Sequence, residues 1–303
     1  MKRHKCGKDY GTRMMIEGCF TAIVTPFRNG AVDFPALDAL VEEQVAAGVD
    51  GIVPVGTTGE SPTLSVEEHQ QVIERVIAAV KRRCLVIAGT GANATDEAVE
   101  LTRHAAAAGA DATLQVTPYY NKPSQEGLYR HFKQVAEEGK LPVVLYNVPG
   151  RSGREIAVET VKRLSENPGI VAIKEAGGSV DRVSALVNAC DITVVSGDDS
   201  LTLPMMAVGG RGVISVASNV VPADVTRMVH TALDGDLHEA TALHTQLFPL
   251  FRDFFIETNP IPVKAALAML GKIAEEYRLP LCELDENKKQ ILKKTLQDYG
   301  LDV

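Results

Sequence analysis

Apolar and polar residues follow two alternating patterns along this chain. Short runs of apolar, often β-branched residues are typical of strands buried on both faces, and they alternate with longer segments whose apolar positions recur with the helical period. The runs predict strands at 19–24, 52–55, 85–88, 112–117, 142–146, 170–174, 192–195 and 212–216. The helical segments begin at Asp33 and at the Ser65 capping box, and continue at 95–108, 124–138, 155–165, 180–189, 200–208 and 222–233.

The order of these elements predicts the fold class. About eight strand–helix units follow one another without a linker-like stretch, which favours an α/β fold of the (β/α)8 TIM-barrel type over an open doubly wound sheet. The last part of the chain has no strand-like run and predicts about three helices, with breaks at 259–262 and 278–280. We therefore expect a disordered N-terminal tail at 1–17, a catalytic barrel at 18–234 and a C-terminal helical region at 235–303.

Composition narrows the class of protein. The 303 residues are 45% hydrophobic and 23% charged, as in ordinary soluble domains, and the net charge of −8 argues against a nucleic-acid binder. No apolar run approaches the ~18 residues that a membrane span needs. The 5 cysteines form no Cys-x-x-Cys pair, which favours a reducing cytoplasm. The basic first residues lack the apolar segment of a secretory signal, and Met14 or Met15 is a candidate functional start.

Lys174 is the unusual residue of the predicted sixth strand. It lies near the end of the apolar run 169–176, and lysine is seldom placed in such a run unless it is paired or functional. Burial of a lysine lowers its pKa and makes the neutral amine available as a nucleophile. The alternative is a lysine whose stem packs in the core while its ammonium group reaches solvent at the strand end.

Polar residues also follow the other predicted strands, at the end of the barrel where barrel enzymes have their active sites. Strand alternation places Tyr146 and Lys174 on the same face of adjacent strands. A lysine amine that attacks a ketone forms an imine, and a tyrosine hydroxyl can move the protons that this reaction requires. Thr57 and Tyr120 could complete a proton relay.

Arg151 and Thr58 are candidates for binding the carboxylate of an α-keto acid, because a guanidinium group and a hydroxyl both donate to it. Each of these residues also has a simpler interpretation. The segment 56–59 is typical of a tight turn, and Asp198 and Asp199 are predicted helix N-caps. The 7 histidines do not follow predicted strands, which argues against a metal-dependent aldolase, and no cofactor-binding motif is present.

Eight motifs give the sequence a specific resemblance to a known family. From Gly18 to about Leu301 it resembles the dihydrodipicolinate synthase family of pyruvate-dependent class I aldolases, which also contains N-acetylneuraminate lyase. The motifs are Gly56-Thr-Thr-Gly-Glu60, Ala88-Gly-Thr-Gly-Ala-Asn93, Thr117-Pro-Tyr-Tyr-Asn121, Pro123-Ser-Gln-Glu-Gly127, Tyr146-Asn-Val-Pro-Gly-Arg151, Ile173-Lys-Glu-Ala176, Ser196-Gly-Asp-Asp199 and Asn259-Pro-Ile-Pro-Val-Lys264.

The resemblance implies a reaction and residue roles. The reaction is the condensation of pyruvate with L-aspartate 4-semialdehyde in lysine and diaminopimelate biosynthesis, without a cofactor or metal, in a homotetramer that is a dimer of dimers. Lys174 is implied as the Schiff-base lysine and Tyr146 as the general acid/base. Thr57 and Tyr120 are implied to complete the proton relay, and Tyr120 is implied to reach the site from a neighbouring subunit. The implied substrate contacts are Thr58 at the pyruvate carboxylate, Arg151 at the incoming semialdehyde, and the backbone carbonyl of Ile214.

The resemblance also suggests a regulatory site. Many members bind L-lysine as a feedback inhibitor at a dimer interface, and the matching positions here are Ser61, His69, Asn93, Glu97 and Tyr119. Val66 departs from inhibited members that carry a polar residue there, and Glu97 could equally be an ordinary acidic residue of a first helical turn. Two other functions stay open at this point: a lyase for a sugar-derived 2-keto acid that uses the same lysine, and a catalytically silent barrel.

Overall fold

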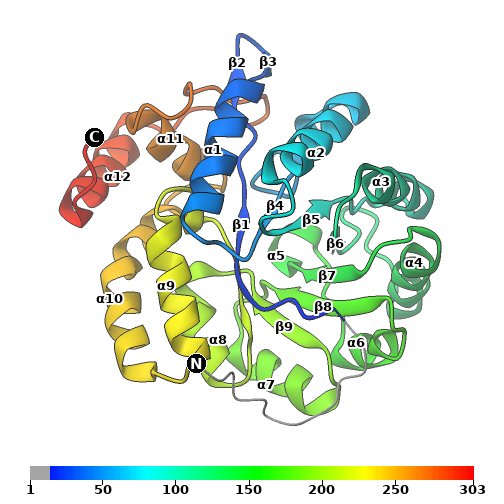
Figure 1. Cartoon of the computed structure of the whole chain (residues 1–303). Helices are drawn as coiled ribbons and strands as arrows, with labels where there is room; N and C mark the ends of the chain where they lie inside the picture. Colours follow the sequence, from blue (N-terminus) through cyan, green and yellow to red (C-terminus); the bar gives the residue numbers. More distant parts are fainter. Residues whose placement is uncertain (1–13) are drawn as a thin grey trace.

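Parallel strands close into a barrel in the order β1-β10-β9-β8-β7-β6-β5-β4 (Figure 1). The computed structural model describes residues 14–303. The barrel strands are β1 (Gly18–Ala22), β4 (Gly51–Val53), β5 (Leu85–Gly89), β6 (Ala112–Val116), β7 (Val143–Asn147), β8 (Ile170–Glu175), β9 (Thr193–Ser196) and β10 (Gly212–Ser215). The predicted (β/α)8 barrel is therefore confirmed, and each predicted strand is present within a few residues of its expected bounds.

Helices surround the barrel and continue beyond it. Those that follow the strands are α1 (Phe34–Ala46), α2 (Val66–Val80), α3 (Thr95–Ala108), α4 (Gln125–Glu138), α5 (Pro149–Ser152), α6 (Val158–Ser165), α7 (Val180–Ala189), α8 (Thr202–Ala207) and α9 (Pro222–Leu233). The C-terminal region adds α10 (Leu237–Asp253), α11 (Ile261–Met269) and α12 (Glu286–Tyr299). In Figure 1, α10 lies beside α9, and α12 lies at the outer edge of the molecule.

Small elements near the barrel ends have no signal in the sequence pattern. They are the hairpin β2 (Phe27–Arg28) and β3 (Ala31–Val32), the helix α5, and the 3-10 helices η1 (Ser61–Thr63), η2 (Asp199–Leu201) and η3 (Ala217–Asn219). Segments of two to four residues are too short for a hydrophobic period to develop. Several of them carry site residues, so the sequence pattern is least informative where the chemistry lies.

Three clusters of buried apolar residues hold the described part of the chain together, and one of them fills the barrel. The interior is filled by side chains from all eight barrel strands, including Val144, Tyr146, Ala172 and Ile214. Ile16 is fully buried in this interior cluster and Met14 packs against it, so core packing begins before Gly18, earlier than the sequence pattern indicates. The part of the predicted tail at 1–13 lies outside the described residues.

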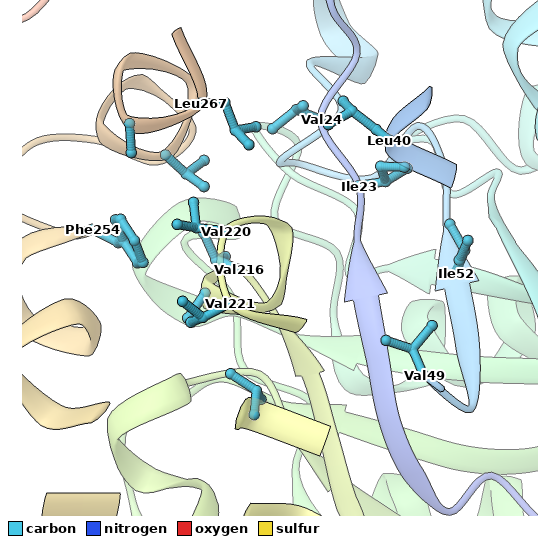
Figure 2. Packing of buried hydrophobic residues seen from close by; sticks show 14 of the residues in the cluster. Ile23, Val24, Leu40, Val49, Ile52, Val216, Val220, Val221, Phe254 and Leu267 are labelled. Atoms are coloured by element: carbon cyan, nitrogen blue, oxygen red, sulfur yellow. The ribbon is translucent and has the colours of Figure 1, made fainter. Parts of the chain in front are cut away.

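A second cluster joins the barrel to the C-terminal region. Figure 2 shows Leu267 of α11 facing Val24, which follows β1, and Phe254 beside Val220 and Val221. These residues belong to one apolar cluster that also includes the inner faces of α1, α2 and α9. Burial of this apolar surface against the barrel helices is what holds the C-terminal helices in place. Within residues 14–303, no helix is both long and apolar enough to cross a membrane.

His131 on α4 should make the fold sensitive to acid. Its side chain is 5% exposed, and burial lowers its pKa from the ordinary 6.5 to about 4. His131 therefore binds a proton at a higher pH in the unfolded chain than in the folded chain. The free energy of unfolding falls as the pH drops from the ordinary pKa of 6.5 towards about 4. We expect a loss of about 2 kcal/mol between about pH 7 and about pH 5 from this group.

Urea unfolding of His131→Gln at a series of pH values measures this contribution. The variant should lose less stability than the wild type over that window. His238→Gln, which changes an exposed histidine, should retain the wild-type pH dependence. Equal pH dependence in His131→Gln and the wild type would refute the assignment.

Candidate active site

Lys174 and Tyr146 meet in the interior of the barrel near the C-terminal ends of its strands. They are register partners on β8 and β7, and the Lys174 Nζ lies 4.4 Å from the centroid of the Tyr146 ring. Both side chains are buried, at 5% and 6% exposure. The Tyr146 carbonyl accepts from the backbone N–H and the hydroxyl of Thr117, at 2.9 and 2.8 Å, which fixes the end of β7 against the segment after β6.

The Lys174 amine is not held in an ion pair with any residue of 14–303. Asp198 and Asp199 are the acidic residues that interact with it electrostatically, and burial is the main cause of the raised pKa of each carboxyl. Gly197 leaves room for the lysine, because a Cβ at that position would lie 2.9 Å from Lys174 Cε and 2.6 Å from Ala176 Cβ. The Lys174 amine is therefore buried and is not engaged in an ion pair, and the backbone at Gly197 packs closely against one side of the lysine side chain.

The carboxylate of Asp199 has a different role from the one that the sequence predicts. Asp198 stands at the N-cap position of η2, but neither η2 nor α8 has a side-chain hydrogen bond at its N-terminus, so the prediction that the carboxylates of Asp198 and Asp199 cap the following helix is wrong. Asp199 instead accepts from the backbone N–H groups of Val216 and Ala217, each at 3.0 Å. Because these residues follow β10, the buried carboxylate ties the loop after β9 to the loop after β10.

Glu175 follows Lys174 but points to the opposite face of β8, as strand alternation requires. Its carboxylate is fully buried and accepts from Asn147 Nδ2 at 2.8 Å and from Arg182 Nε at 2.8 Å. Burial raises the pKa of this carboxyl, whereas the contacts with Arg182 and Asn147 oppose that shift. Glu175 therefore joins β7, β8 and α7 outside the barrel and does not pair with Lys174, a role that the sequence analysis missed.

The segment after β4 presents Thr57 and Thr58 at the same end of the barrel. Thr58 is buried, and its hydroxyl accepts from Asn259 Nδ2 at 3.1 Å. Arg151 on α5 donates to the backbone carbonyl of Asn259 at 3.0 Å, although its side chain is exposed. Asn259 thus joins two predicted substrate-binding residues. Its only signal in the sequence is its place in the motif that begins at 259.

Tyr120 lies on the surface of its own chain. Its side chain is 90% exposed, whereas Lys174 and Tyr146 are buried. Its backbone is in the left-handed region with φ +71, which is uncommon for a residue other than glycine. The structure therefore does not bring Tyr120 to Lys174 of the same chain. A tyrosine held outward in this way is suited to contact another molecule.

The residues of the predicted lysine site lie in neighbouring segments. Asn93 Nδ2 donates to the Tyr119 carbonyl at 3.3 Å, and Glu97 is exposed in the first turn of α3. Burial raises the pKa of the Tyr119 hydroxyl, and the negative charge of Glu97 adds to the shift. His69 is buried on α2, with Nε2 2.9 Å from the Gly89 carbonyl, and burial lowers its pKa. Ser61 lies in η1, half-buried.

Comparisons with known proteins identify the family. The chain matches the profile of the dihydrodipicolinate synthetase family over residues 15–299. A 4-hydroxy-tetrahydrodipicolinate synthase of Methanocaldococcus jannaschii is 54% identical over 288 residues, covering 95% of this chain and 100% of the relative. That of Syntrophus aciditrophicus is 53% identical over 289 residues, with 95% and 99% covered. The solved structure of the enzyme from Methylacidiphilum fumariolicum has a TM-score of 0.93 at 54% identity, with 94% and 96% covered.

Other solved relatives carry information on ligands and assembly. The dihydrodipicolinate synthase of Acinetobacter baumannii, 47% identical with a TM-score of 0.93, was solved in complex with pyruvate. That of Cyanidioschyzon merolae, 41% identical with a TM-score of 0.92, has lysine bound. A third, 41% identical with a TM-score of 0.92, is a monomeric variant.

The full-length similarity settles the choice between the functions that the sequence left open. The curated relatives at 50 to 54% identity carry one function, and it is not the cleavage of a sugar-derived keto acid. The chain therefore belongs to the dihydrodipicolinate synthetase family, whose members at this identity are 4-hydroxy-tetrahydrodipicolinate synthases, lyases of the class I aldolase type.

Proposed function

We propose that Lys174 is the residue through which this enzyme binds pyruvate and that Tyr146 is its main acid/base partner. The observation that supports this most directly is the buried Lys174 amine over the Tyr146 ring, at the end of the barrel where such enzymes react. The neutral amine attacks C2 of pyruvate, and the resulting carbinolamine loses water to give the imine. Loss of a C3 proton then gives an enamine.

The second half of the reaction joins the two substrates. The enamine carbon attacks the aldehyde of L-aspartate 4-semialdehyde and forms a carbon–carbon bond. The amino group of the adduct then attacks C2 of the imine, closes the ring and releases the Lys174 amine. Each of these steps moves a proton, which a tyrosine hydroxyl near the amine can donate or accept. Tyr146 takes this role, and Thr57 and Tyr120 connect it to solvent.

The two carboxylates of the substrates have separate partners. Thr58 contributes a hydroxyl for the pyruvate carboxylate, and the buried position of that hydroxyl beside Asn259 restricts its orientation. Arg151 lies exposed on α5, where its guanidinium group can receive the carboxylate of the incoming semialdehyde. The backbone carbonyl of Ile214, a residue of β10, is the further substrate contact in this proposal.

Substrate assays test this assignment of the second substrate. The enzyme should condense pyruvate with L-aspartate 4-semialdehyde and should not cleave sialic acid or 2-keto-3-deoxygluconate. Arg151→Gln should raise the KM for the semialdehyde and leave the KM for pyruvate nearly unchanged. Arg130→Gln, which changes an exposed arginine on α4, serves as the control. If Arg151→Gln instead raises only the KM for pyruvate, the two carboxylate assignments are wrong.

We further propose that Tyr120 acts in the active site of a neighbouring subunit, within a dimer of dimers. The support is its 90% exposed side chain on a constrained backbone. Tyr120→Phe should lower turnover without unfolding the protein. A mixed dimer of Tyr120→Phe and Lys174→Met protomers, purified with two different tags, tests the exchange. One site of that dimer has both Lys174 and a Tyr120 from its partner, so activity should return to about half of the wild type.

The mixed dimer should behave differently if Tyr120 acts in the active site of its own chain. In that case neither site of the mixed dimer is complete, and its activity stays at or below that of Tyr120→Phe alone. A monomeric wild-type protein with full activity would also contradict the proposal. Gel filtration of each variant is the control for assembly.

L-Lysine is proposed as a feedback inhibitor that binds near Asn93, Glu97 and Tyr119. The negative charge of Glu97 beside the half-exposed Tyr119 suits a ligand amine. Initial rates should fall as L-lysine rises to millimolar concentration. Glu97→Gln should raise the half-inhibiting concentration by about tenfold, whereas Glu100→Gln on the same helix should not change it. A flat response of the wild-type enzyme would exclude this inhibitor.

A further inference from the structure

The turn that carries Thr57 and Thr58 has an unfavourable backbone conformation at both ends. Val55 has φ +49 and Glu60 has φ +55, in the left-handed region that L-residues seldom adopt. For a β-branched residue such as Val55 this conformation is an outlier. Backbone strain of this kind persists only when the surrounding structure enforces it, and it is common at active sites.

Close packing around Val55 helps to hold its backbone in the left-handed conformation. A Cβ on Gly59 would lie 2.9 Å from the backbone N of Val55, and a Cβ on Gly89 would lie 2.6 Å from the Val55 carbonyl oxygen. Glycine at these two positions lets the turn fold tightly onto β5. These contacts hold the first half of the turn but do not account for Glu60.

Glu60 is held by a buried ion pair with the C-terminal region. Its carboxylate binds the Nζ of Lys264 on α11, and both side chains are fully buried. The Lys264 ammonium also lies 4.3 Å from the centroid of the Phe27 ring and 5.1 Å from that of Tyr277. The second oxygen of Glu60 faces the backbone N–H of Arg278 at 3.5 Å. A residue with φ +55 is thus fixed through its side chain.

A second link joins the same two segments. Asn259, which precedes α11, donates to the Thr58 hydroxyl at 3.1 Å. The short segment from Asn259 to Lys264 therefore binds the turn at two residues, Thr58 and Glu60. Buried ion pairs contribute little net stability compared with apolar residues of the same size, and in some proteins they are retained because they specify a conformation. A positioning role therefore fits this pair better than a stabilising one.

We propose that the Glu60–Lys264 ion pair positions Thr57 and Thr58 for catalysis. Through this pair the C-terminal region, which lies outside the barrel, sets the geometry of the pyruvate site. The inference rests on the proposed roles of Thr57 and Thr58. In this proposal neither Glu60 nor Lys264 contacts the substrate. Both affect catalysis by fixing the position of the turn that carries Thr57 and Thr58.

The test removes both charges together, because Lys264→Met alone would leave the buried Glu60 carboxylate unpaired. The double variant Glu60→Gln/Lys264→Met keeps the side-chain lengths and removes the ion pair. It should fold, with a thermal midpoint close to the wild type. The value of kcat/KM for pyruvate should fall by roughly tenfold to a hundredfold, because small displacements of positioning groups have effects of this size. If the double variant does not fold, Glu60→Asp carries the same kinetic test, because it keeps both charges but shortens the side chain that fixes the end of the turn.

Lys272→Met is the matched control. Lys272 also joins the C-terminal region to the barrel by an ion pair, with Glu43 on α1, but that pair is partly exposed and does not involve the turn that carries Thr57 and Thr58. This variant should keep the wild-type kcat and KM for pyruvate. If it lowers kcat/KM as much as the loss of the Glu60–Lys264 pair does, the effect comes from general loosening of the C-terminal region, and the proposal is wrong.

A double-mutant cycle with Thr58→Ala separates positioning from mere stability. Thr58→Ala should raise the KM for pyruvate in the wild type, and it should have a much smaller effect once the ion pair is gone, because the hydroxyl is already misplaced. Equal effects in the two backgrounds, or a fall in the thermal midpoint with unchanged kinetics, would overturn the inference. If Thr58→Ala has no effect in the wild type, the proposed role of Thr58 itself fails, which is a distinct result.

Discussion

Lys174→Met is expected to abolish the condensation, lowering kcat/KM by about a thousandfold or more because the nucleophile is lost. Methionine has a similar length and is compatible with the apolar side chains of the barrel interior, such as Val195, the register partner of Lys174 on β9, so the variant should remain folded. Lys264 is the other buried lysine within residues 14–303, and it cannot substitute because its ammonium is held in the ion pair with Glu60. Steady-state kinetics, with circular dichroism to verify folding, measure the effect.

Lys162→Met is the control for this prediction. Lys162 is an exposed lysine in the last turn of α6, and its loss should leave kcat and KM unchanged. Substantial turnover in Lys174→Met would show that the imine forms elsewhere or not at all. An equal loss of activity in both variants would indicate damage that is not specific to the site.

Tyr146→Phe is expected to lower kcat by roughly a hundredfold to ten-thousandfold, which is the usual range for the loss of a general acid/base. The phenyl ring keeps its contact with the Lys174 side chain, whose Nζ lies 4.4 Å from the ring centroid in the wild type. Binding of pyruvate should therefore change less than turnover, and the KM for pyruvate should change by a smaller factor than kcat.

Tyr129→Phe provides the comparison. The Tyr129 ring packs against Arg163 on the outer surface, so loss of its hydroxyl should have no effect on turnover. If Tyr146→Phe retains wild-type kcat, another group moves the protons and the proposed relay is wrong. If kcat and the KM for pyruvate instead worsen by the same factor, Tyr146 acts mainly in binding.

The barrel itself could be predicted from the sequence because its signals are local and repeated. Each strand is an apolar run that is buried on both faces, and the longer helices have an apolar stripe, in some cases with a recognisable start such as the Ser65 capping box. Strand alternation was also sufficient to place Tyr146 and Lys174 on one face, which their register and contact confirm. These inferences needed no information on distant contacts.

The rest of the site depends on contacts between residues far apart in the chain. Asn259 meets Thr58, and Lys264 meets Glu60, across about two hundred residues of sequence. No period or propensity encodes such a pairing. The role of Asp199 was predicted wrongly for a related reason: a local cap is the usual function of an aspartate before a helix, but its carboxylate binds the loop after β10 instead.

Borohydride reduction in the presence of pyruvate tests the central claim most directly. Reduction of the imine would attach the pyruvate carbon skeleton irreversibly to the amine that formed it, and peptide mass mapping locates that residue. A single adduct on the peptide that contains Lys174, absent from Lys174→Met, is the result that the proposed mechanism predicts. An adduct on another lysine, or no adduct while the enzyme is active, would contradict it.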